Sequence, residues 1–415
     1  MNKRFCRIVQ GIYKVGMYLL PWSVPTLIEG PGSVGKLPSI IKDLGYKKVM
    51  VVTGNTIRSL GIPDPMLRSL TENGIDYVVF SNLQANPTDQ NVMDGLKVFR
   101  ESGCQAFIAF GGGSPMDCCK AIAALSVKKG KTVQDLQGLF KIRKKVPTIF
   151  AVPTTAGTGS ETTVAAVVTD SRSHHKASIS DTCLIPKFAV LDAELTKDLP
   201  PKVTSTTGLD ALCHAVEAYT NKTYNTKLED KFAEDSVKLI YDNLYEAYIH
   251  GDNLDARQNM QKAAFLAGRA FTRGSVGYVH AIGHTLSGLY GTSHGLAMAV
   301  ILPHVMTLYG KAAHKRLARL AEVCGIATNG GDKAGEYKTT GENAKAGDEE
   351  KALAFIRWME DLQAKMDIPK GFDFIEDKDI PQIVDWAMKE GNPLYPVPAV
   401  WDKKDFEKAV ESIRL

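Results

Sequence analysis

Several features that would point to a special class of protein are missing from this chain of 415 residues. Its seven cysteines include no C-x2-C pair, which argues against both a disulfide framework and a zinc ribbon. The formal net charge of +4 is too small to indicate a nucleic-acid partner. No segment approaches the roughly 20 apolar residues of a membrane span. We therefore expect a globular protein of the reducing cytoplasm, without stable membrane insertion.

The first 24 residues form a basic and partly apolar extension. Lys3, Arg4 and Arg7 come before an apolar run over residues 15–22, an order that faintly resembles a signal peptide. The apolar core is short, polar residues interrupt it, and no small-residue cleavage site is clear. We interpret residues 1–24 as an extension to which the sequence assigns no role, and weak contact with a membrane surface stays open.

The first half of the chain alternates short apolar runs with helical patterns. Strand, helix and strand in succession predict a doubly wound, mainly parallel, Rossmann-like sheet in an α/β domain. The overall apolar and charged fractions, 44% and 23%, are those of an ordinary globular protein. Strands are expected near residue 25 and at 48–53, 77–80, 106–110, 149–152, 164–169 and 188–192, with helices around 63–74, 89–102 and 118–127.

The second half of the chain has helical periodicity throughout, which predicts an all-α array whose side chains can project ligands inward. We expect an α/β domain over residues 25–197 and a helical domain over residues 198–415. Residues 330–349 are rich in Gly, Lys and Glu and predict a solvated loop. Helices are expected at about 204–221, 227–249, 256–273, 275–289, 295–311, 313–324, 350–366, 378–390 and 402–413.

Two loops rich in glycine or threonine follow predicted buried strands. The first, residues 111–117, is Gly-Gly-Gly-Ser-Pro-Met-Asp and leads into a helix, where Ser114 can cap and Pro115 suits the first turn. Glycine amides and a helix N-terminus suit a phosphate group, although the motif is neither G-x-G-x-x-G nor a P-loop. The second loop, residues 153–162, offers threonine hydroxyls and glycine amides to the other side of a nucleotide. The alternatives are a plain strand-to-helix turn for the first and a polar connection for the second.

Three histidines follow an H-x3-H-x9-H pattern in a stretch of apolar and small residues. The spacing of four places His280 and His284 on one face of a helix. Gly291 is expected to end that helix, so that His294 can return towards the same face. Unpaired buried imidazoles would be costly, and a shared metal ion is the most economical explanation.

A second pair, Asp210 and His214, has the same spacing of four residues. Alone, such a pair usually lies on the exposed face of an amphipathic helix and binds no ligand. Together with the histidines, it predicts two helices that enclose a divalent ion with imidazole nitrogens and one carboxylate oxygen. We therefore expect residues 25–197 to be a dinucleotide-binding domain and residues 198–415 a metal-binding, catalytic domain, with redox chemistry at the cleft between them.

These motifs, in this order, resemble those of the iron-dependent (group III) alcohol dehydrogenases. The resemblance runs from about residue 25 to the C-terminus and implies the architecture that this family shares with dehydroquinate synthase. The motifs that carry it are residues 111–117, 153–161 and 208–217 and the three-histidine stretch.

The resemblance also implies roles for particular residues. Asp210, His214, His280 and His294 match the family's metal ligands, and His284 matches a histidine near nicotinamide and substrate that is not a ligand. Phe271 matches an aromatic position of the substrate pocket. The positions that match dinucleotide contacts are Gly112, Gly113, Ser114, Thr154, Thr155 and Thr158, with Asn86 and Lys176 as further members.

Three departures from the family's pattern stand out. Many members that use NAD have Asp where this chain has Gly54, and a carboxylate there would repel a 2′-phosphate. The chain should therefore admit NADP as well as NAD, and Arg58 is the residue expected to help. Leu394 and Tyr395 stand where many members carry Arg, so the motif does not specify which alcohol is the substrate. Residues 1–24 precede the point at which family members usually start.

The function that the resemblance implies is reversible hydride transfer between a small alcohol or aldehyde and NAD or NADP, in a homodimer. Fe(II) is the expected metal, and Zn(II) suits the same ligands. One alternative is a polyol (glycerol-type) dehydrogenase of the same fold. The other is a protein that binds a nucleotide or a metal without catalysis.

Overall fold

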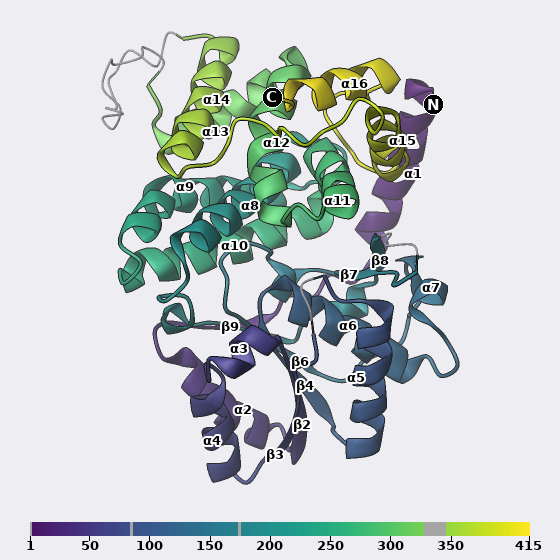
Figure 1. The fold of residues 1–415 in the computed structure, drawn as a ribbon, viewed down its shortest axis with the longest axis vertical. Helices are drawn as coiled ribbons and strands as arrows, with labels where there is room; N and C mark the ends of the chain where they lie inside the picture. The colour runs from purple at the N-terminus through teal and green to yellow at the C-terminus, as the bar shows by residue number, and fades with distance from the viewer. Residues whose placement is uncertain (1, 84–85, 173–175, 328–345) are drawn as a thin grey trace. The chain divides into compact units, whose positions relative to one another are not determined.

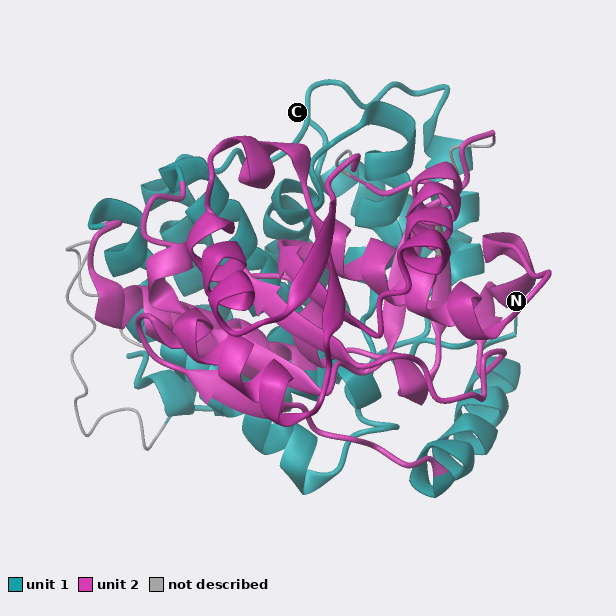
Figure 2. Ribbon diagram, turned by 90° about the horizontal axis from the view of Figure 1, so that it is seen from below, with its two compact units in different colours: residues 1–19, 200–250, 269–415 teal, residues 20–199, 251–268 magenta. Residues whose placement is uncertain are grey.

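The computed structural model describes residues 2–83, 86–172, 176–327 and 346–415. Its contacts divide the chain into two compact units, which Figure 2 shows in different colours. The α/β unit comprises Leu20–Leu199 and Gly251–Gly268, and the helical unit comprises Met1–Leu19, Pro200–His250 and Arg269–Leu415. Each unit is therefore built from segments that are distant in the sequence.

A parallel sheet forms the centre of the α/β unit. Among the described residues it has six strands in the order β1-β9-β6-β4-β2-β3, and each neighbouring pair is parallel. This confirms the predicted doubly wound sheet. The strands are β1 (Thr26–Glu29), β2 (Lys48–Thr53), β3 (Asp76–Phe80), β4 (Ala106–Gly111), β6 (Ile149–Pro153) and β9 (Phe188–Leu191).

Helices cover both faces of this sheet, which explains why its central strands are continuous apolar runs (Figure 1). Alternate side chains of β2 enter different cores: Val49 and Val51 pack on one face, and Met50 and Val52 on the other. The helices are α2 (Leu37–Asp43), α3 (Asn55–Ser59) and α4 (Asp64–Glu72) on the first face, and α5 (Asp89–Ser102) and α6 (Gly113–Val127) on the second.

Helix α6 begins five residues earlier than the predicted start at Cys118. Gly112 is its N-cap, and no side chain accepts a hydrogen bond there, so the prediction that Ser114 caps the helix was wrong. The extended backbone of Gly112 (φ −78°, ψ −160°) carries the chain from β4 directly into the helix. Ser114 therefore lies within the first turn.

A second, smaller sheet was predicted only in part. Its order is β5-β8-β7, and β7 pairs with β8 in antiparallel fashion. The sequence predicts β7, but β8 alternates polar residues and gives no apolar run. The elements are β5 (Gly138–Leu139), β7 (Ala165–Thr169) and β8 (Lys176–Ser180), with helix α7 (Val133–Leu136) and the 3-10 turns η1 (Ser33–Lys36), η2 (Ser160–Thr162), η3 (Thr182–Leu184) and η4 (Ala193–Leu195).

The helical unit contains only helices among its described elements, which confirms the predicted all-α second half. Helix α8 is buried along most of its length and packs against α9 and α12. Residues 330–345 of the predicted loop lie outside the described residues. The last two residues of the predicted loop, Asp348 and Glu349, instead begin α14. The helices are α1 (Lys3–Leu19), α8 (Pro201–Thr220), α9 (Lys227–Ile249), α11 (Tyr278–Tyr290), α12 (His294–Tyr309), α13 (Lys311–Cys324), α14 (Asp348–Lys365), α15 (Ile380–Gly391) and α16 (Lys403–Ser412), while α10 (Leu254–Gly274) is divided between the units.

Within the described ranges, no single helix has the length and hydropathy of a bilayer span. Helices α12 and α13 meet that criterion only as a pair, and a bend of 120° separates them.

Candidate functional site

Helix α8 presents three acidic or imidazole side chains on one buried face. Asp210, His214 and Glu217 are 2%, 4% and 1% exposed. Spacings of four and three residues bring side chains to the same side of a helix. The helix is otherwise apolar here, so these polar groups need partners from neighbouring helices.

Two further histidines meet this face of α8 from α11 and α12. The ligand atoms of Asp210, His214, His280 and His294 all lie within 4.8 Å of one another. Oδ1 of Asp210 is 3.4 Å from Nε2 of His294 and 3.9 Å from Nδ1 of His214. The structure therefore brings together the four side chains that the sequence predicts as a metal site.

The route by which His294 reaches this cluster differs from the prediction. Gly291 does end α11, in the left-handed conformation with φ 67°. However, His294 is the first residue of α12, so three helices supply the four side chains, and the prediction of two helices was wrong. The short turn between α11 and α12 places the start of one helix beside the other.

Two buried atoms of the cluster show that it suits a cation. Oδ1 of Asp210 and Nε2 of His280 are buried and accept no hydrogen bond from any described residue. Both atoms carry lone pairs, and a divalent ion would satisfy them together. Burial raises the pKa of Asp210 to about 8, and the nearby Glu217 carboxylate adds to the rise. A bound cation would offset this cost of burying the carboxylate.

Glu217 fixes the orientation of His280. Its Oε2 lies 2.6 Å from Nδ1 of His280 and accepts from the backbone N–H of Gly277, while Oε1 accepts from the N–H of Val279. The carboxylate thus holds the start of α11 and leaves Nε2 of His280 as the atom for a metal. Burial raises the pKa of Glu217 to about 8, and these backbone donors oppose the rise.

His284 lies beside the four-residue cluster and has partners of its own. Its ring stacks on that of His294 with a centroid distance of 5.2 Å, and its Nδ1 is 2.7 Å from Oε1 of Glu390. The hydroxyl of Tyr395 donates to the same Glu390 oxygen. Burial raises the pKa of Glu390, but His284 and Tyr395 outweigh it and hold this pKa below its usual value.

Phe271, from α10, stacks on His214 with ring centroids 4.2 Å apart and planes inclined by 13°. The aromatic ring predicted to line the substrate pocket therefore contacts one of the four clustered side chains. It restricts the orientation of the His214 imidazole.

The predicted dinucleotide contacts gather at one edge of the parallel sheet. Gly54 follows β2, Gly112 and Gly113 follow β4, and Thr154 follows β6, and these three strands are neighbours. The carboxyl ends of parallel strands are the usual place for a ligand in such a sheet.

Direct contacts join the two predicted loops. The N–H of Thr154 donates to the carbonyl of Gly111 over 3.0 Å. A Cβ atom on Gly113 would lie 3.0 Å from the methyl carbon of Thr158, so a side chain at this position would crowd the second loop. Thr155 also lies close, with its hydroxyl 3.4 Å from where a Cβ on Gly112 would stand.

Other members of the predicted set lie around the same loops. The backbone N–H of Asn86 donates to the hydroxyl of Ser114 over 3.3 Å. Burial raises the pKa of Asp117 on α6, and the positive charge of Lys176, which lies on β8, opposes this rise. The buried hydroxyl of Thr154 has no hydrogen-bond partner in the described chain, which leaves it available to a ligand.

Two residues that hold the second loop were not assigned a role from the sequence. Nζ of Lys120 contacts the carbonyls of Ser160, Thr163 and Ala165 at 2.6–3.0 Å, as well as two hydroxyls. Asp117 accepts from the hydroxyl of Ser160. Burial lowers the pKa of Lys120 to about 8, and the nearby acidic groups oppose this shift. The sequence does contain a signal for Lys120, because it is a lysine within the otherwise apolar run 118–125.

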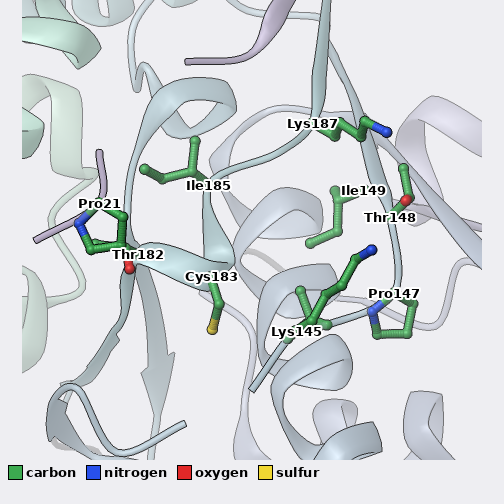
Figure 3. Close-up of a pocket in the computed structure, with 10 residues that line it drawn as sticks. Pro21, Lys145, Pro147, Thr148, Ile149, Thr182, Cys183, Ile185 and Lys187 are labelled. Carbon is green, nitrogen blue, oxygen red and sulfur yellow. The ribbon is translucent and has the colours of Figure 1, made fainter. Parts of the chain in front are cut away.

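A separate pocket of about 340 Å³ opens in the α/β unit (Figure 3). Ile149 at the start of β6 and Lys187 just before β9 are among its lining residues. It therefore lies at the amino ends of these strands, and none of its lining residues belongs to the predicted site.

A parallel sheet with glycine-rich loops at its carboxyl edge, together with a helical unit that gathers one carboxylate and three imidazoles, defines a metal-dependent, nucleotide-linked oxidoreductase. Comparison with known proteins identifies the family to which the chain belongs. Residues 25–193 match the model of the family described as iron-containing alcohol dehydrogenase, and residues 204–413 match that of its C-terminal domain.

Characterised relatives agree with these matches. The chain is 38% identical to 1,3-propanediol dehydrogenase of Citrobacter freundii over 92% of this chain and 94% of the relative. It is 37% identical to NAD-dependent methanol dehydrogenase of Bacillus methanolicus over 74% and 80% of the two chains. A crystal structure of 1,3-propanediol oxidoreductase superposes with a TM-score of 0.87 at 33% identity and covers 95% of this chain and 99% of that one.

The protein belongs to the iron-containing alcohol dehydrogenase family. It is an alcohol oxidoreductase linked to a nicotinamide dinucleotide, and its fold is that of the solved relatives. Iron and NAD are the cofactors that the family and the relatives support.

Proposed function

We propose that Asp210, His214, His280 and His294 hold one Fe(II) ion, with which the enzyme interconverts small alcohols and aldehydes. The convergence of these four side chains within 4.8 Å carries the proposal. The two buried atoms that lack hydrogen bonds, on Asp210 and His280, support it. Zn(II) accepts the same ligands, and the choice of iron depends on the family.

The side chains around the cluster have separate tasks. When bound, the metal ion supplies Lewis acidity that polarises a substrate oxygen, and the nicotinamide carries the hydride. Phe271 forms an apolar wall beside His214 and favours the carbon skeleton of a small alcohol. His284 takes up or delivers the substrate proton, because it lies beside the four-residue cluster and its ring is held by Glu390. Glu390 orients the His284 ring through Nδ1, and this leaves Nε2 for proton transfer.

The dinucleotide binds, in this proposal, at the carboxyl edge of the parallel sheet. The amides at the start of α6 have no side-chain cap and can donate to its phosphates. Gly112, Gly113 and Ser114 form one wall, and Thr154, Thr155 and Thr158 form the other, with Asn86 and Lys176 at the margin. Since Gly54 offers no carboxylate, both NAD and NADP are accepted.

We further propose a cytoplasmic homodimer, with domains at residues 25–197 and 198–415. The cytoplasmic assignment is supported by seven cysteines that are all free, as expected in a reducing compartment. The homodimer depends on the family resemblance alone. The substrate class follows the relatives, which act on methanol and 1,3-propanediol, whereas a polyol such as glycerol is the competing substrate.

Anaerobic reconstitution tests this function. Metal-free protein is loaded with Fe(II) or Zn(II) and mixed with NAD or NADP and a panel of methanol, ethanol, 1,3-propanediol and glycerol, or with aldehydes and the reduced dinucleotides. Nicotinamide absorbance should change only with metal present and fastest with Fe(II). Equal turnover without metal, or in Asp210→Ala, would refute the proposed site.

His284→Ala separates proton transfer from metal binding. Turnover should fall roughly 100-fold or more, the usual contribution of a general acid–base group, while metal content stays near that of the wild type. Equal loss of both would make His284 a ligand instead.

A further inference from the structure

Helix α1 carries an apolar stripe that no described residue covers. Phe5, Ile8, Ile12, Val15 and Leu19 are 52%, 62%, 67%, 64% and 82% exposed. Successive spacings of three, four, three and four residues place all five on one side of the helix. Isolated exposed apolar residues are normal, but a continuous stripe of this size indicates a surface that binds something.

The opposite side of α1 is fixed to the helical unit. Cys6 and Gln10 are fully buried. The side-chain amide of Gln10 donates to the carbonyls of Pro393 and Tyr395 at 3.0 and 2.8 Å. Figure 1 shows α1 beside α15 and α16 in this unit. Rotation of the stripe towards the protein would break these contacts, so the stripe faces outward in the folded chain.

Arg7 adds to this attachment. Its guanidinium donates to the carbonyls of Val397 and Pro398 at 2.9 and 3.0 Å. The helix is therefore held at both Arg7 and Gln10, which lie near the middle of its length.

The charged side chains of α1 itself are all basic. Lys3, Arg4, Arg7 and Lys14 are the ionisable side chains of this kind in the helix, and the first acidic residue of the sequence is Glu29. Lys3 forms ion pairs with Asp402 and Asp405. Arg4 and Lys14 are exposed and lie on the same flank of the stripe by helical geometry.

These charges help to decide whether the partner of the stripe is a second copy of this chain or a lipid surface. Two copies of α1 packed stripe to stripe would bring their basic flanks together, and the helix itself carries no acidic group to compensate, since the nearby Asp402 and Asp405 are paired with Lys3. The large apolar residues exposed elsewhere in the described chain include Leu60, just after α3, and Leu228 and Ile249, at opposite ends of α9. They form no second stripe of the same kind for α1 of another copy to bind.

We propose that α1 is an interfacial helix that binds an anionic lipid surface. An apolar stripe with aromatic and aliphatic side chains, flanked by Arg and Lys, is the pattern of helices that lie in the plane of a membrane interface. The stripe enters the boundary between headgroups and acyl chains, and Arg4 and Lys14 contact anionic headgroups. Seventeen residues with four basic side chains and a buried glutamine lie on a bilayer and do not cross it.

The family match begins at residue 25, so α1 lies outside the part of the chain that the family's activity explains. Attachment to a lipid surface is thus independent of the proposed metal and substrate.

Vesicle sedimentation with the full-length, metal-loaded enzyme tests the proposal. Vesicles of phosphatidylcholine alone are compared with vesicles that contain 30% phosphatidylglycerol, at about 50 and 500 mM salt. The wild type should bind the anionic vesicles at least tenfold more tightly than the neutral ones, and binding should weaken at high salt. Ile8→Ser/Ile12→Ser should lose this binding more than tenfold, and Arg4→Glu/Lys14→Glu should lose the preference for anionic vesicles.

Leu228→Ser is the matched control, because Leu228 is 53% exposed on another helix, and it should bind like the wild type. Circular dichroism and alcohol oxidation without vesicles should be unchanged in the stripe variant, which shows that it folds. Absence of vesicle binding by the wild type, or equal binding by the stripe variant, would overturn the proposal. So would a wild-type oligomer, measured by light scattering, that dissociates in Ile8→Ser/Ile12→Ser, because a second copy would then cover the stripe.

Discussion

The Nδ1 atom of His280 lies 2.6 Å from Oε2 of Glu217, and the same carboxylate accepts hydrogen bonds from the amides of Gly277 and Val279. One buried side chain thus determines both the orientation of a metal-ligand candidate and the start of the helix that carries it. A histidine that contacts a carboxylate in this way is a more basic and better oriented ligand.

Replacement of this carboxylate should weaken metal binding without abolishing the fold. Glu217→Gln keeps the size of the side chain but loses the charge-assisted contact, and we expect a loss of about 10–100-fold in metal affinity. Titration calorimetry with Zn(II) measures this affinity. Glu246→Gln, which alters an exposed Glu–His contact on α9, is the control and should bind metal as the wild type does. Unchanged affinity in Glu217→Gln would contradict the role of Glu217.

Metal should stabilise the wild type but not Asp210→Asn. Binding at a thousandfold excess over Kd adds about 4 kcal/mol to stability. Differential scanning fluorimetry with Fe(II), with Zn(II) and with a chelator measures the shift in Tm. Asp210→Asn should show no shift, and its metal-free form should be at least as stable as metal-free wild type, because it removes a buried carboxylate with an unsatisfied oxygen.

Asp192 provides the control for this second prediction, since it is fully buried but accepts from the backbone N–H groups of Gly32 and Val34. Asp192→Asn should lower the Tm of the metal-free protein and keep the increase that metal causes. A metal-induced shift of normal size in Asp210→Asn would show that the ion binds elsewhere.

Gly54→Asp should change the choice of dinucleotide. A Cβ atom at Gly54 meets no atom closer than the Pro115 side chain at 4.0 Å, and φ is −84°, so aspartate fits. Its charge should reduce kcat/KM for NADP relative to NAD by roughly tenfold, which corresponds to about 1.4 kcal/mol of repulsion. Steady-state kinetics with both dinucleotides measure this ratio. Gly54→Asn has the same size without charge and should keep the wild-type ratio; a strong NAD preference in the wild type itself would contradict the interpretation of Gly54.

Removal of the Lys120 ammonium should destabilise the α/β unit. Lys120→Met leaves three buried carbonyls and Asp117 without their cationic partner, and loss of one member of a buried charged pair costs about 3 kcal/mol or more. Urea denaturation followed by circular dichroism should show the lower stability. Lys129→Met, at an exposed lysine just beyond α6, should change it by less than about 0.5 kcal/mol. Equal midpoints for the two variants would count against the role of Lys120.

The sequence predicts most of the α/β sheet because its strands are buried on both faces. Strand β2 was predicted with its observed bounds, since five consecutive buried residues after Lys48 leave a clear apolar run. Strand β8 gives no such run, because Ser178 and Ser180 alternate along it, and it forms through pairing with β7. Pairing between distant segments of this kind is not visible in local periodicity.

The candidate site was predicted where spacing along one helix brings residues together, as for Asp210 and His214. The position of His294 on a third helix depends on the turn after Gly291, and that geometry does not follow from spacing. The partners Glu217 and Glu390 were not assigned either. Each contacts a histidine more than 60 positions away in the sequence, and tertiary packing alone determines such contacts.

Helix α1 was not predicted, although its apolar residues repeat with helical spacing. Its attachment has a practical consequence for the enzyme. The carbonyl of Tyr395 accepts from Gln10, the hydroxyl of Tyr395 donates to Glu390, and Glu390 holds His284. Three consecutive contacts thus connect the first helix to the histidine that we propose as the proton carrier. A purification tag fused ahead of α1 can therefore affect His284 through these contacts. Kinetic constants compared between preparations with different tags would include this effect.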